Sequence, residues 1–393
     1  MFKLITPLQS KPTTSPSKPE RPQIAKEQSR RKKYKAKQKQ NKEYRWSSLE
    51  GKKMCYPIPM KVLIYFQDVD TIKNSGIGRA MSHQLLALKD AGVETTIDKN
   101  DTYDIAHINT YWAKSHRALR KAKKKGIPVI VHGHSTYEDF RNSFKCWKLV
   151  APIYNAQLKY MYSRADLIIT PTPYSKKLIE GYGFNKKVIA ISNGIDIASY
   201  AKNAEAVKAF KEKFHLKEDE KFVMGVGFPF ERKGIIDFFE VARKFPDVKF
   251  FWFGYLQRIL MNEKVAKAIR HKPSNVIMPG YTKGELIRGA YQSATCLFFP
   301  SYEETEGIVT LEALASHCPL VVRDIGVYEG WLKDGENAHL CKNNEEFEQT
   351  IRTLLEKGED PKILEAGYKT ARERDLPLIG QELKQAYSTL LAK

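Results

Sequence analysis

The feature that most constrains this sequence is an alternation of short apolar runs with segments of helical periodicity, which starts again halfway along the chain. The apolar runs of the first series are 61–66, 104–109, 128–132, 166–170 and 187–191, and those of the second are 221–226, 248–253, 275–278, 296–299 and 319–322. Helical segments near 77–91, 114–125, 142–164, 174–181, 234–245, 260–270, 283–293, 308–317 and 345–357 separate them. Such alternation is typical of parallel sheets covered on both faces. So many strands would be unusual in one sheet, so we predict an α/β protein with two Rossmann-like, doubly wound domains facing a central cleft.

Charge supports a boundary near residue 199. Residues 60–199 contain 21 Lys/Arg and 12 Asp/Glu, whereas residues 200–393 contain 29 of each. We expect an N-terminal domain over 60–199, a C-terminal domain over 200–375, and a last helix over 376–393 that packs back on the first domain. No stretch approaches the roughly 18 uncharged apolar residues of a membrane-spanning helix.

The first 59 residues are strongly basic, with 16 Lys/Arg and 4 Asp/Glu, and their polar composition predicts disorder. Three interpretations stay open for this tail: a nucleic-acid arm, a membrane-attracted arm, or an upstream extension of a protein that begins at Met60, which we favour. It has no apolar core of a secretory signal. The five cysteines are odd in number and scattered, which favours a reducing cytosol over a disulfide framework or a zinc site.

Two loops of the first half follow predicted strands. Gly76 lies in Ser75-Gly-Ile-Gly-Arg79, where glycines admit a close ligand and a helix start offers free N–H groups to an anion. The alternative is an ordinary tight turn. His134 lies in His132-Gly-His-Ser135, where it could face the cleft and hydrogen-bond a hydroxyl-rich ligand, although a lone histidine is more often structural. No third ligand at a usual spacing supports a metal there.

Two loops of the second half carry charge at helix starts. Arg232 and Lys233 precede a helix, although the N-terminus of a helix disfavours cations. A diphosphate bound at this helix start would explain the two cations. The alternative is that they are a solvated pair on the surface. Glu304 and Glu312 stand eight positions apart, one in an acidic loop and one inside the helix that follows Gly307. Carboxylates accept hydrogen bonds from sugar and ribose hydroxyls. A ligand with hydroxyls at both ends and phosphates between them is a nucleotide sugar.

Over residues 60–393 the chain resembles the retaining glycosyltransferases of the GT-B fold. Their signature, a Glu followed after seven residues by a second Glu, matches residues 304–312. The resemblance implies that the first Glu holds the donor sugar, the second the ribose, and that the two cations at 232–233 neutralise the diphosphate. It places Gly76 beside that diphosphate, His134 near the transferred sugar, and Ile308 and Val309 at the donor. Many members carry Arg where this chain has Phe228, which removes one diphosphate contact.

A narrower likeness is to bacterial glycosyltransferases that add a second sugar to glucosyldiacylglycerol. Residues 107–111, 132–141, 170–175 and 302–307 carry it. It implies transfer of glucose or galactose from UDP-glucose or UDP-galactose to monoglucosyldiacylglycerol, by a hexosyltransferase peripheral on the inner, cytoplasmic face of the cell membrane. We expect no metal and no other cofactor. Fixed cations aimed at the departing oxygen lower the barrier. A soluble or polysaccharide acceptor is the alternative within the class.

Membrane attachment has its own candidates. Residues 114–125 contain seven Lys/Arg and no acid, among them Lys114, Arg117, Lys121 and Lys124. Behind them an apolar stripe recurs every three or four residues through Phe144, Trp147, Ala151, Tyr154, Leu158 and Met161, with Lys145, Lys148 and Lys159 beside it. This pattern predicts an interfacial helix on an anionic surface. The alternatives are that the stripe packs into the core and that Pro152 splits the helix.

A function of another class also fits the basic front half. The basic front half could bind nucleic acid, with the glycosyltransferase-like body of the chain acting only as a scaffold. No nucleic-acid motif accompanies the charge, so we expect no specific nucleic-acid partner.

Overall fold

The computed structural model describes residues 45–49, 52–56, 60–72 and 75–392, in two separate units, Met1–Ile58 and Pro59–Lys393. In the first unit, β1 (Arg45–Leu49) and β2 (Lys52–Tyr56) pair antiparallel, with Arg45 opposite Tyr56. The prediction of disorder is therefore wrong for these strands, and for residues 1–44 it lies outside the described residues.

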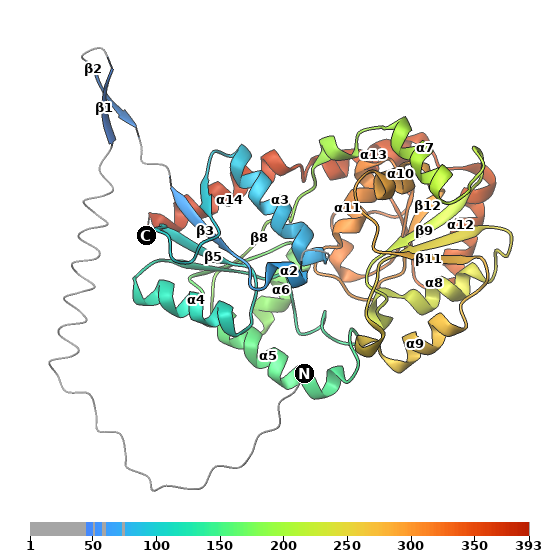
Figure 1. Cartoon of the computed structure of the whole chain (residues 1–393), viewed down its shortest axis with the longest axis horizontal. Coiled ribbons are helices and arrows are strands. Elements are labelled where there is room, and N and C mark those ends of the chain that lie inside the picture. Colours follow the sequence, from blue (N-terminus) through green and yellow to red (C-terminus); the bar gives the residue numbers. More distant parts are fainter. Residues whose placement is uncertain (1–44, 50–51, 57–59, 73–74, 393) are drawn as a thin grey trace, which may run out of the picture. The chain divides into compact units, whose positions relative to one another are not determined.

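The first sheet of the second unit has six parallel strands in the order β4-β3-β5-β6-β7-β8. Its strands are β3 (Lys61–Tyr65), β4 (Glu94–Thr96), β5 (Ile105–Ile108), β6 (Val129–His132), β7 (Leu167–Thr170) and β8 (Val188–Ala190). One face is covered by α3 (Gly76–Asp90) and α14 (Leu376–Leu391), and the other by α4 (Ala113–Lys124), α5 (Trp147–Tyr162) and α6 (Pro173–Gly181). A short α2 (Val69–Ile72) precedes α3 (Figure 1).

The second sheet repeats this plan in the order β11-β10-β9-β12-β13-β14. Its strands are β9 (Phe222–Val226), β10 (Lys249–Phe253), β11 (Val276–Gly280), β12 (Cys296–Phe299), β13 (Leu320–Arg323) and β14 (His339–Cys341). On one face lie α7 (Ala204–Lys213), α10 (Glu285–Ser293), α11 (Ile308–Ala315) and α13 (Pro361–Arg372), and on the other α8 (Ile235–Ala242), α9 (Glu263–Arg270) and α12 (Asn344–Lys357). Short 3-10 turns lie at Ile197–Tyr200, Glu231–Lys233, Arg258–Leu260 and Gly326–Tyr328.

Both sheets reverse their strand order beside the first strand of the domain, between β3 and β5 and between β9 and β12. In doubly wound sheets ligands bind at the carboxyl ends of strands at such a switch point. The loops that contain Gly76, Arg232-Lys233 and Glu304 follow β3, β9 and β12. The predicted fold class is confirmed, and the fold brings the predicted loops to the edges where ligands bind.

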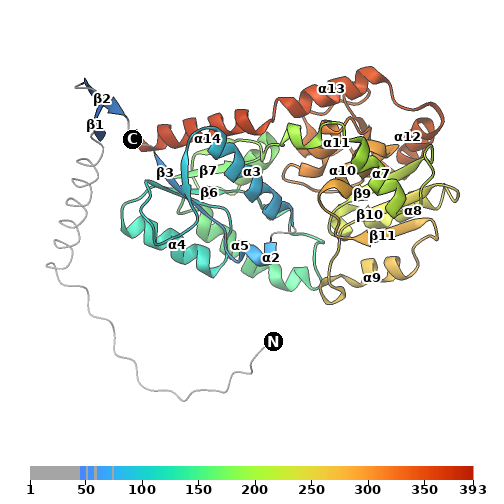
Figure 2. The ribbon, with the colours of Figure 1, turned by 45° about the horizontal axis from the view of Figure 1, so that its top comes forward.

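The chain crosses between the two sheets twice, and the two crossings touch. Ile195 N–H donates to the Arg374 carbonyl oxygen at 2.9 Å, and Leu376 N–H donates to the Ile195 carbonyl oxygen at 3.2 Å. Beyond them α14 packs along α3, with Ile379, Leu383 and Tyr387 buried in the core of the first sheet (Figure 2). The last helix of the chain thus completes the first domain.

The apolar stripe of α5 faces the core, so its interpretation as the membrane-facing side is wrong. Tyr154, Leu158 and Met161 are buried, and Phe144 and Trp147 are half-buried against the same cluster. Pro152 lies on the exposed side and does not end the helix. The spacing that predicted an amphipathic helix was right, but the stripe it marks is the one that α5 buries against β5, β6 and β7.

Candidate active site

Arg232, Lys233 and Glu304 form one cluster between the two sheets. The first two lie in the turn after β9, and Glu304 lies in the loop after β12. Gly234 lets these loops meet: its φ is +72°, and a Cβ there would lie 2.2 Å from the Pro300 carbonyl oxygen. The close approach requires glycine, because both the conformation and the space exclude a side chain.

Within the cluster Glu304 accepts contacts from both cations. Lys233 Nζ donates to Glu304 Oε1, and Arg232 Nη1 lies 3.6 Å from the same oxygen. Burial raises the pKa of Glu304, but the charges of Lys233 and Arg232 outweigh it, so its pKa lies below the usual value. Burial also lowers the pKa of Lys233. At this site an ionised carboxylate lies beside two cations. Because little water reaches these groups, it screens their electrostatic interaction poorly.

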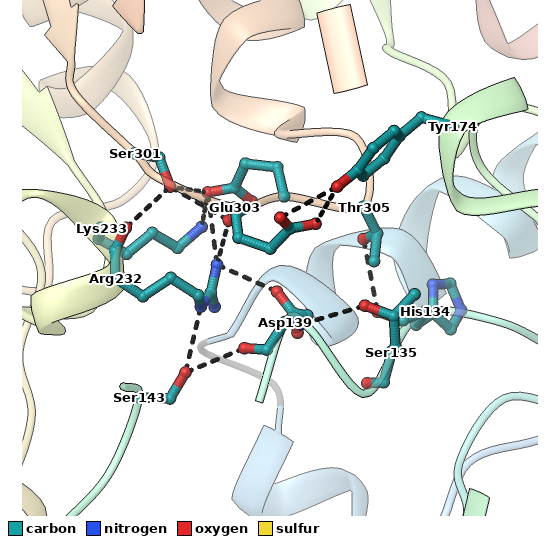
Figure 3. A network of polar contacts seen from close by, with 12 residues as sticks. His134, Ser135, Asp139, Ser143, Tyr174, Arg232, Lys233, Ser301, Glu303 and Thr305 are labelled. Atoms are coloured by element: carbon teal, nitrogen blue, oxygen red, sulfur yellow. Dashed lines mark hydrogen bonds and ion pairs between the residues drawn. The ribbon is translucent and has the colours of Figure 1, made fainter. Parts of the chain in front are cut away.

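Arg232 also reaches the first domain. Its guanidinium lies 3.0 Å from Asp139 Oδ1 and donates from Nε to Ser143 Oγ at 3.1 Å, as Figure 3 shows. Burial raises the pKa of Asp139, which the charge of Arg232 opposes. The cluster therefore spans the two domains, with its cations from the second and an additional carboxylate from the first.

Glu312 is held by a residue that the sequence interpretation did not select. Arg79 in α3 places its guanidinium 3.4 Å from Glu312 Oε1, and the Tyr291 hydroxyl donates to Glu312 Oε2 at 2.8 Å. The Glu312 charge raises the pKa of Arg79. This is a second ionic contact between the domains, at the opposite end of α11 from Glu304.

A cavity of about 130 Å³, here called the glycine cavity, lies between Gly76 and α11. Its walls are Ser75, Gly76, Arg79, Val226, Gly227, Phe228, Phe253, Gly254, Tyr255, Tyr281, Thr282, Ile287, Ile308, Val309 and Glu312. Four predicted donor-binding residues, Gly76, Ile308, Val309 and Glu312, thus line one space. Typical ligand clefts enclose about 300–1,000 Å³. A nucleotide sugar therefore requires side chains or domains to move apart before it fits.

His134 lies at the end of β6 in a stack of buried histidines. Its ring is 3.8 Å from that of His132, and its Nε2 lies 3.0 Å from Asn109 Oδ1. His107 continues the stack and bonds through Nδ1 to the Tyr387 hydroxyl at 2.8 Å. Burial lowers the pKa of His107 and of His134 to about 3. The His134 ring is therefore neutral at pH 7 and can act only through hydrogen bonds.

The loop after β12 is bound to the first domain at several residues in succession. Tyr174 donates its hydroxyl to Glu303 at 3.0 Å, and Thr172 Oγ1 donates to the Thr305 carbonyl oxygen at 2.8 Å. Thr305 Oγ1 donates to the His134 carbonyl oxygen at 3.4 Å, which joins His134 to this loop. Glu306 accepts from the Asn193 side chain at 2.7 Å. These contacts hold Glu304 against the first domain.

The Glu303 carboxyl predicts a measurable pH dependence of stability. Burial raises its pKa to about 7, partly opposed by the bond from Tyr174. Because the folded-state pKa lies above that of the unfolded chain, its stabilising contribution is complete at low pH and is lost as pH rises through about 7. Glu303→Gln, a neutral mimic, should therefore have a Tm that rises relative to wild type between about pH 5 and pH 8, measured by thermal denaturation. A constant difference would contradict the raised pKa.

The predicted surface residues are dispersed rather than gathered at the cleft. Lys114, Arg117 and Lys124 are exposed on α4, and Lys148 is exposed on α5. Lys114 forms an ion pair with Asp68, and Lys121 donates to Asn100 Oδ1 at 2.9 Å. None of these side chains lines the glycine cavity.

Several contacts of the site were missed by sequence interpretation. Arg79 stands in the quoted glycine loop, directly after Gly78, and its position at a helix start was a usable signal. Asp139 and Glu303 are neighbours of selected residues, but only the fold shows that they meet Arg232 and Tyr174. Asn109 follows β5 and was part of a quoted segment.

Comparison with known proteins identifies two family models along the second unit. Residues 76–199 match Glycosyltransferase Family 4, and residues 206–371 match Glycosyl transferases group 1. A processive diacylglycerol alpha-glucosyltransferase of Acholeplasma laidlawii is 50% identical over 333 residues, which cover 84% of this chain and 99% of that protein. An alpha-galactosylglucosyldiacylglycerol synthase of Streptococcus pneumoniae is 24% identical over 73% of this chain and 74% of its own length.

Solved structures show the same fold. HepE of Anabaena, in a complex with UDP-glucose, superposes with a TM-score of 0.67 at 16% identity, over 84% of this chain and all of that one. The Acholeplasma relative is similar enough, and along enough of both chains, to establish kinship rather than shared architecture alone. The two domains, the cluster at the switch points and these relatives agree: the chain belongs to the group 1 glycosyltransferases of the GT-B fold and is a hexosyltransferase.

Proposed function

We propose that this enzyme transfers an α-glucosyl group from UDP-glucose to diacylglycerol-based acceptors, first to diacylglycerol and then to the monoglucosyldiacylglycerol formed. The observation that carries the proposal is the 50% identity to the processive Acholeplasma enzyme along nearly its whole length. Our sequence interpretation named monoglucosyldiacylglycerol as acceptor with either glucose or galactose as the sugar, and the name of that relative favours glucose.

The cluster supports a specific chemical role. The bond between the sugar C1 and the β-phosphate oxygen breaks and leaves its electron pair on UDP, while a bond forms from C1 to the acceptor hydroxyl oxygen, whose proton is released. Negative charge grows on the departing oxygen, and preorganised cations stabilise it. Lys233 and Arg232 are the cations available, so we propose that they act in place of a metal ion.

Roles for the other residues follow from their positions. Glu304, held by Lys233, is proposed to bind the hydroxyls of the transferred sugar, and Glu312 those of the ribose. The start of α11 at Ile308 and Val309 offers N–H groups to the diphosphate. His134 is proposed to hydrogen-bond the sugar as a neutral ring, and retention of configuration is proposed from the family resemblance.

The same site suggests the decisive assay. The purified chain is incubated with UDP-glucose or UDP-galactose and with vesicles that contain diacylglycerol or monoglucosyldiacylglycerol. We expect glucosyl transfer to both lipids and little transfer of galactose. Absence of transfer to either lipid would refute the lipid acceptor, and preferred transfer of galactose would refute the donor.

A peripheral position on the cytoplasmic face of the membrane is part of the proposal. Every helix in the part of the chain that the structure describes falls short of the length and hydropathy needed to span a bilayer. The start of α5 leaves Leu149 78% exposed and Ile153 61% exposed, and Val150 and Trp112 lie open beside them. Trp112 contacts Tyr154 of α5 at a ring distance of 6.3 Å, so α4 and α5 adjoin at this surface.

Basic side chains surround these apolar ones. Lys145 and Lys148 flank the start of α5, and Arg117, Arg120 and Lys124 are exposed on α4. Near an anionic surface each cation contributes about 1 kcal/mol. We define Trp112, Leu149, Val150 and Ile153 as the α5 surface, and we propose that it enters the lipid interface while the α4 cations meet the headgroups.

Substitution at the α5 surface should weaken membrane binding. Burying one such side chain contributes about 1.5–3 kcal/mol. Leu149→Glu should therefore lower the affinity for vesicles with anionic lipid by at least about tenfold, measured by co-sedimentation. Leu378→Glu is the matched control, since Leu378 is 51% exposed on α14. Equal loss in both variants, or in neither, would contradict this surface.

A further inference from the structure

A second, larger cavity is lined by Arg232 of the cluster. It encloses about 720 Å³, and none of its lining residues also lines the glycine cavity. Arg232 and Glu303 form the wall nearest the reacting groups, since Arg232 contacts Glu304 and Glu303 precedes it. The volume lies inside the range of about 300–1,000 Å³ that small-molecule clefts occupy. We call it the carboxylate cavity.

All but two of the residues that line the carboxylate cavity have charged or amide side chains, the exceptions being Ile236 and Tyr302. Its carboxylates are Glu138, Glu231, Asp237, Glu240 and Glu303, and its basic residues are Arg141, Arg232 and Lys264. Ile236 is the one aliphatic residue among its described walls. The excess of carboxylates over basic residues disfavours a phosphate or a nucleotide.

Each carboxylate already has a protein partner, which fixes its oxygens. Glu240 accepts from Asn344 at 2.8 Å, Asp237 accepts from the Tyr302 hydroxyl at 2.9 Å, and Glu231 pairs with Lys264 at 2.9 Å. A carboxylate has about four lone-pair positions, so each keeps capacity to accept more hydrogen bonds. Among the described residues no three acidic, histidine or cysteine side chains are placed to hold a metal ion. Fixed acceptors that do not converge on one point suit a neutral ligand with many hydroxyls.

Tyr302 adds an apolar surface to this polar wall. It is 49% exposed, its hydroxyl is tied to Asp237, and the Arg323 guanidinium lies 4.0 Å from its ring centre. These two contacts hold the ring in one orientation. An aromatic face fixed beside hydrogen-bond acceptors offers both contacts that a hexose needs, since one side of a sugar ring presents C–H groups.

The carboxylate cavity also lies next to the segment that leads to the α5 surface. Arg141 and Asn142 line it, and α5 begins at Trp147, two residues before Leu149. Arg232 N–H donates to the Asn142 carbonyl oxygen at 3.4 Å, which ties this segment to the reacting cluster. A headgroup whose lipid tail stays in the membrane therefore has the cavity on its way to Glu304.

We propose that the carboxylate cavity is the acceptor subsite that binds the hexose headgroup of a glycosylated diacylglycerol, with Tyr302 as the stacking ring and Glu240 and Glu138 as hydroxyl acceptors. The inference rests on the proposed function and deepens it. It explains how a single site could serve repeated transfers: diacylglycerol leaves the cavity empty, whereas monoglucosyldiacylglycerol fills it and gains affinity.

The test compares the two acceptors in the full chain. Glu240→Trp places an indole in the cavity from an exposed position of α8, and Tyr302→Ala removes the ring. Each should raise the KM for monoglucosyldiacylglycerol by at least about tenfold, while the KM for diacylglycerol changes less than about twofold. An equal change for both acceptors, or no change for either, would overturn the subsite.

A matched aromatic substitution separates the two cavities. Tyr281 is 45% exposed and lines the glycine cavity. Tyr281→Ala should raise the KM for UDP-glucose, whereas Glu240→Trp and Tyr302→Ala should leave that constant within about twofold. Thermal denaturation of each variant identifies any that fails to fold. If Tyr302→Ala does not fold, Glu240→Trp alone tests the subsite.

A binding measurement keeps this inference separate from the proposed function. Saturation-transfer NMR with methyl α-glucoside tests the cavity without lipid or donor. We expect signal from the wild-type chain and its loss in Glu240→Trp. Absence of signal in the wild type overturns the subsite even if glycolipid is made. In a further outcome, the wild-type chain binds methyl α-glucoside, Glu240→Trp does not, and no lipid is glucosylated. That outcome upholds the hexose subsite and refutes only the lipid acceptor.

Discussion

Lys233→Ala is expected to lower kcat by about 10²–10³-fold, the usual cost of losing one preorganised group that stabilises developing charge. Lys233 is half-buried, and it contacts the Glu304 carboxylate in a site that also contains Arg232. Its loss would leave Arg232 as the one remaining cation of the pair that we propose to stabilise the departing diphosphate. The measurement is steady-state transfer from UDP-glucose to monoglucosyldiacylglycerol, with vesicle composition held constant.

Two comparisons isolate the charge from the fold. Lys233→Met keeps most of the aliphatic stem but removes the ammonium, which lies 5.2 Å from the centre of the Phe299 ring, so a loss of kcat shared with Lys233→Ala is a loss of charge. Lys369→Ala removes an exposed lysine of α13 and should not change kcat. Activity of Lys233→Met near the wild-type level would refute the role proposed for the cation.

Arg79→Met is expected to raise the KM for UDP-glucose by about 10–100-fold. A hydrogen bond to a charged group contributes about 1.5–3 kcal/mol, and each 1.4 kcal/mol is a factor of ten. Arg79 is the described cation in contact with Glu312, which is buried and 3% exposed. Without it the carboxylate that we propose to bind the ribose loses the cation that holds Oε1 in place.

The readout for Arg79 is the division of the effect between KM and kcat. We expect the donor KM to rise while the KM for the acceptor stays within about twofold, because Arg79 does not line the carboxylate cavity. Arg288→Met is the control, since Arg288 pairs with Glu285 on the surface of α10. A donor KM that stays at the wild-type value would show that Glu312 does not need Arg79.

The sequence predicted the architecture because buried parallel strands have a strong local signal. Runs such as Val62–Phe66 and Cys296–Phe299 are apolar on both faces and flanked by glycine or polar residues. The short edge strands β4 and β14 escaped notice, since Glu94–Thr96 and His339–Cys341 contain polar residues. Polar composition rather than edge position hid them, because the edge strands β8 and β11, which are largely apolar, were predicted.

The candidate site was predictable to the extent that it lies in contiguous motifs. Arg232, Lys233 and Glu304 stand in the loops that follow β9 and β12, and Glu312 stands in the helix after the second of these loops. The switch-point geometry brings the first three together. The contacts across the cleft were not predictable, because Arg79–Glu312 joins residues 233 positions apart and depends on how two domains face each other. The same limit explains α5: periodicity marks its apolar stripe but does not say whether protein or lipid covers it.

The packing of α14 on the first sheet has a consequence for how the polypeptide is made. Tyr387 and Leu383 lie in one core with Val62 and Ile64, although more than three hundred residues of translation separate them. Domains generally fold during synthesis in order from the N-terminus. Here the first Rossmann-like domain leaves the ribosome with part of its apolar face uncovered, and that face stays uncovered until α14 has been synthesised.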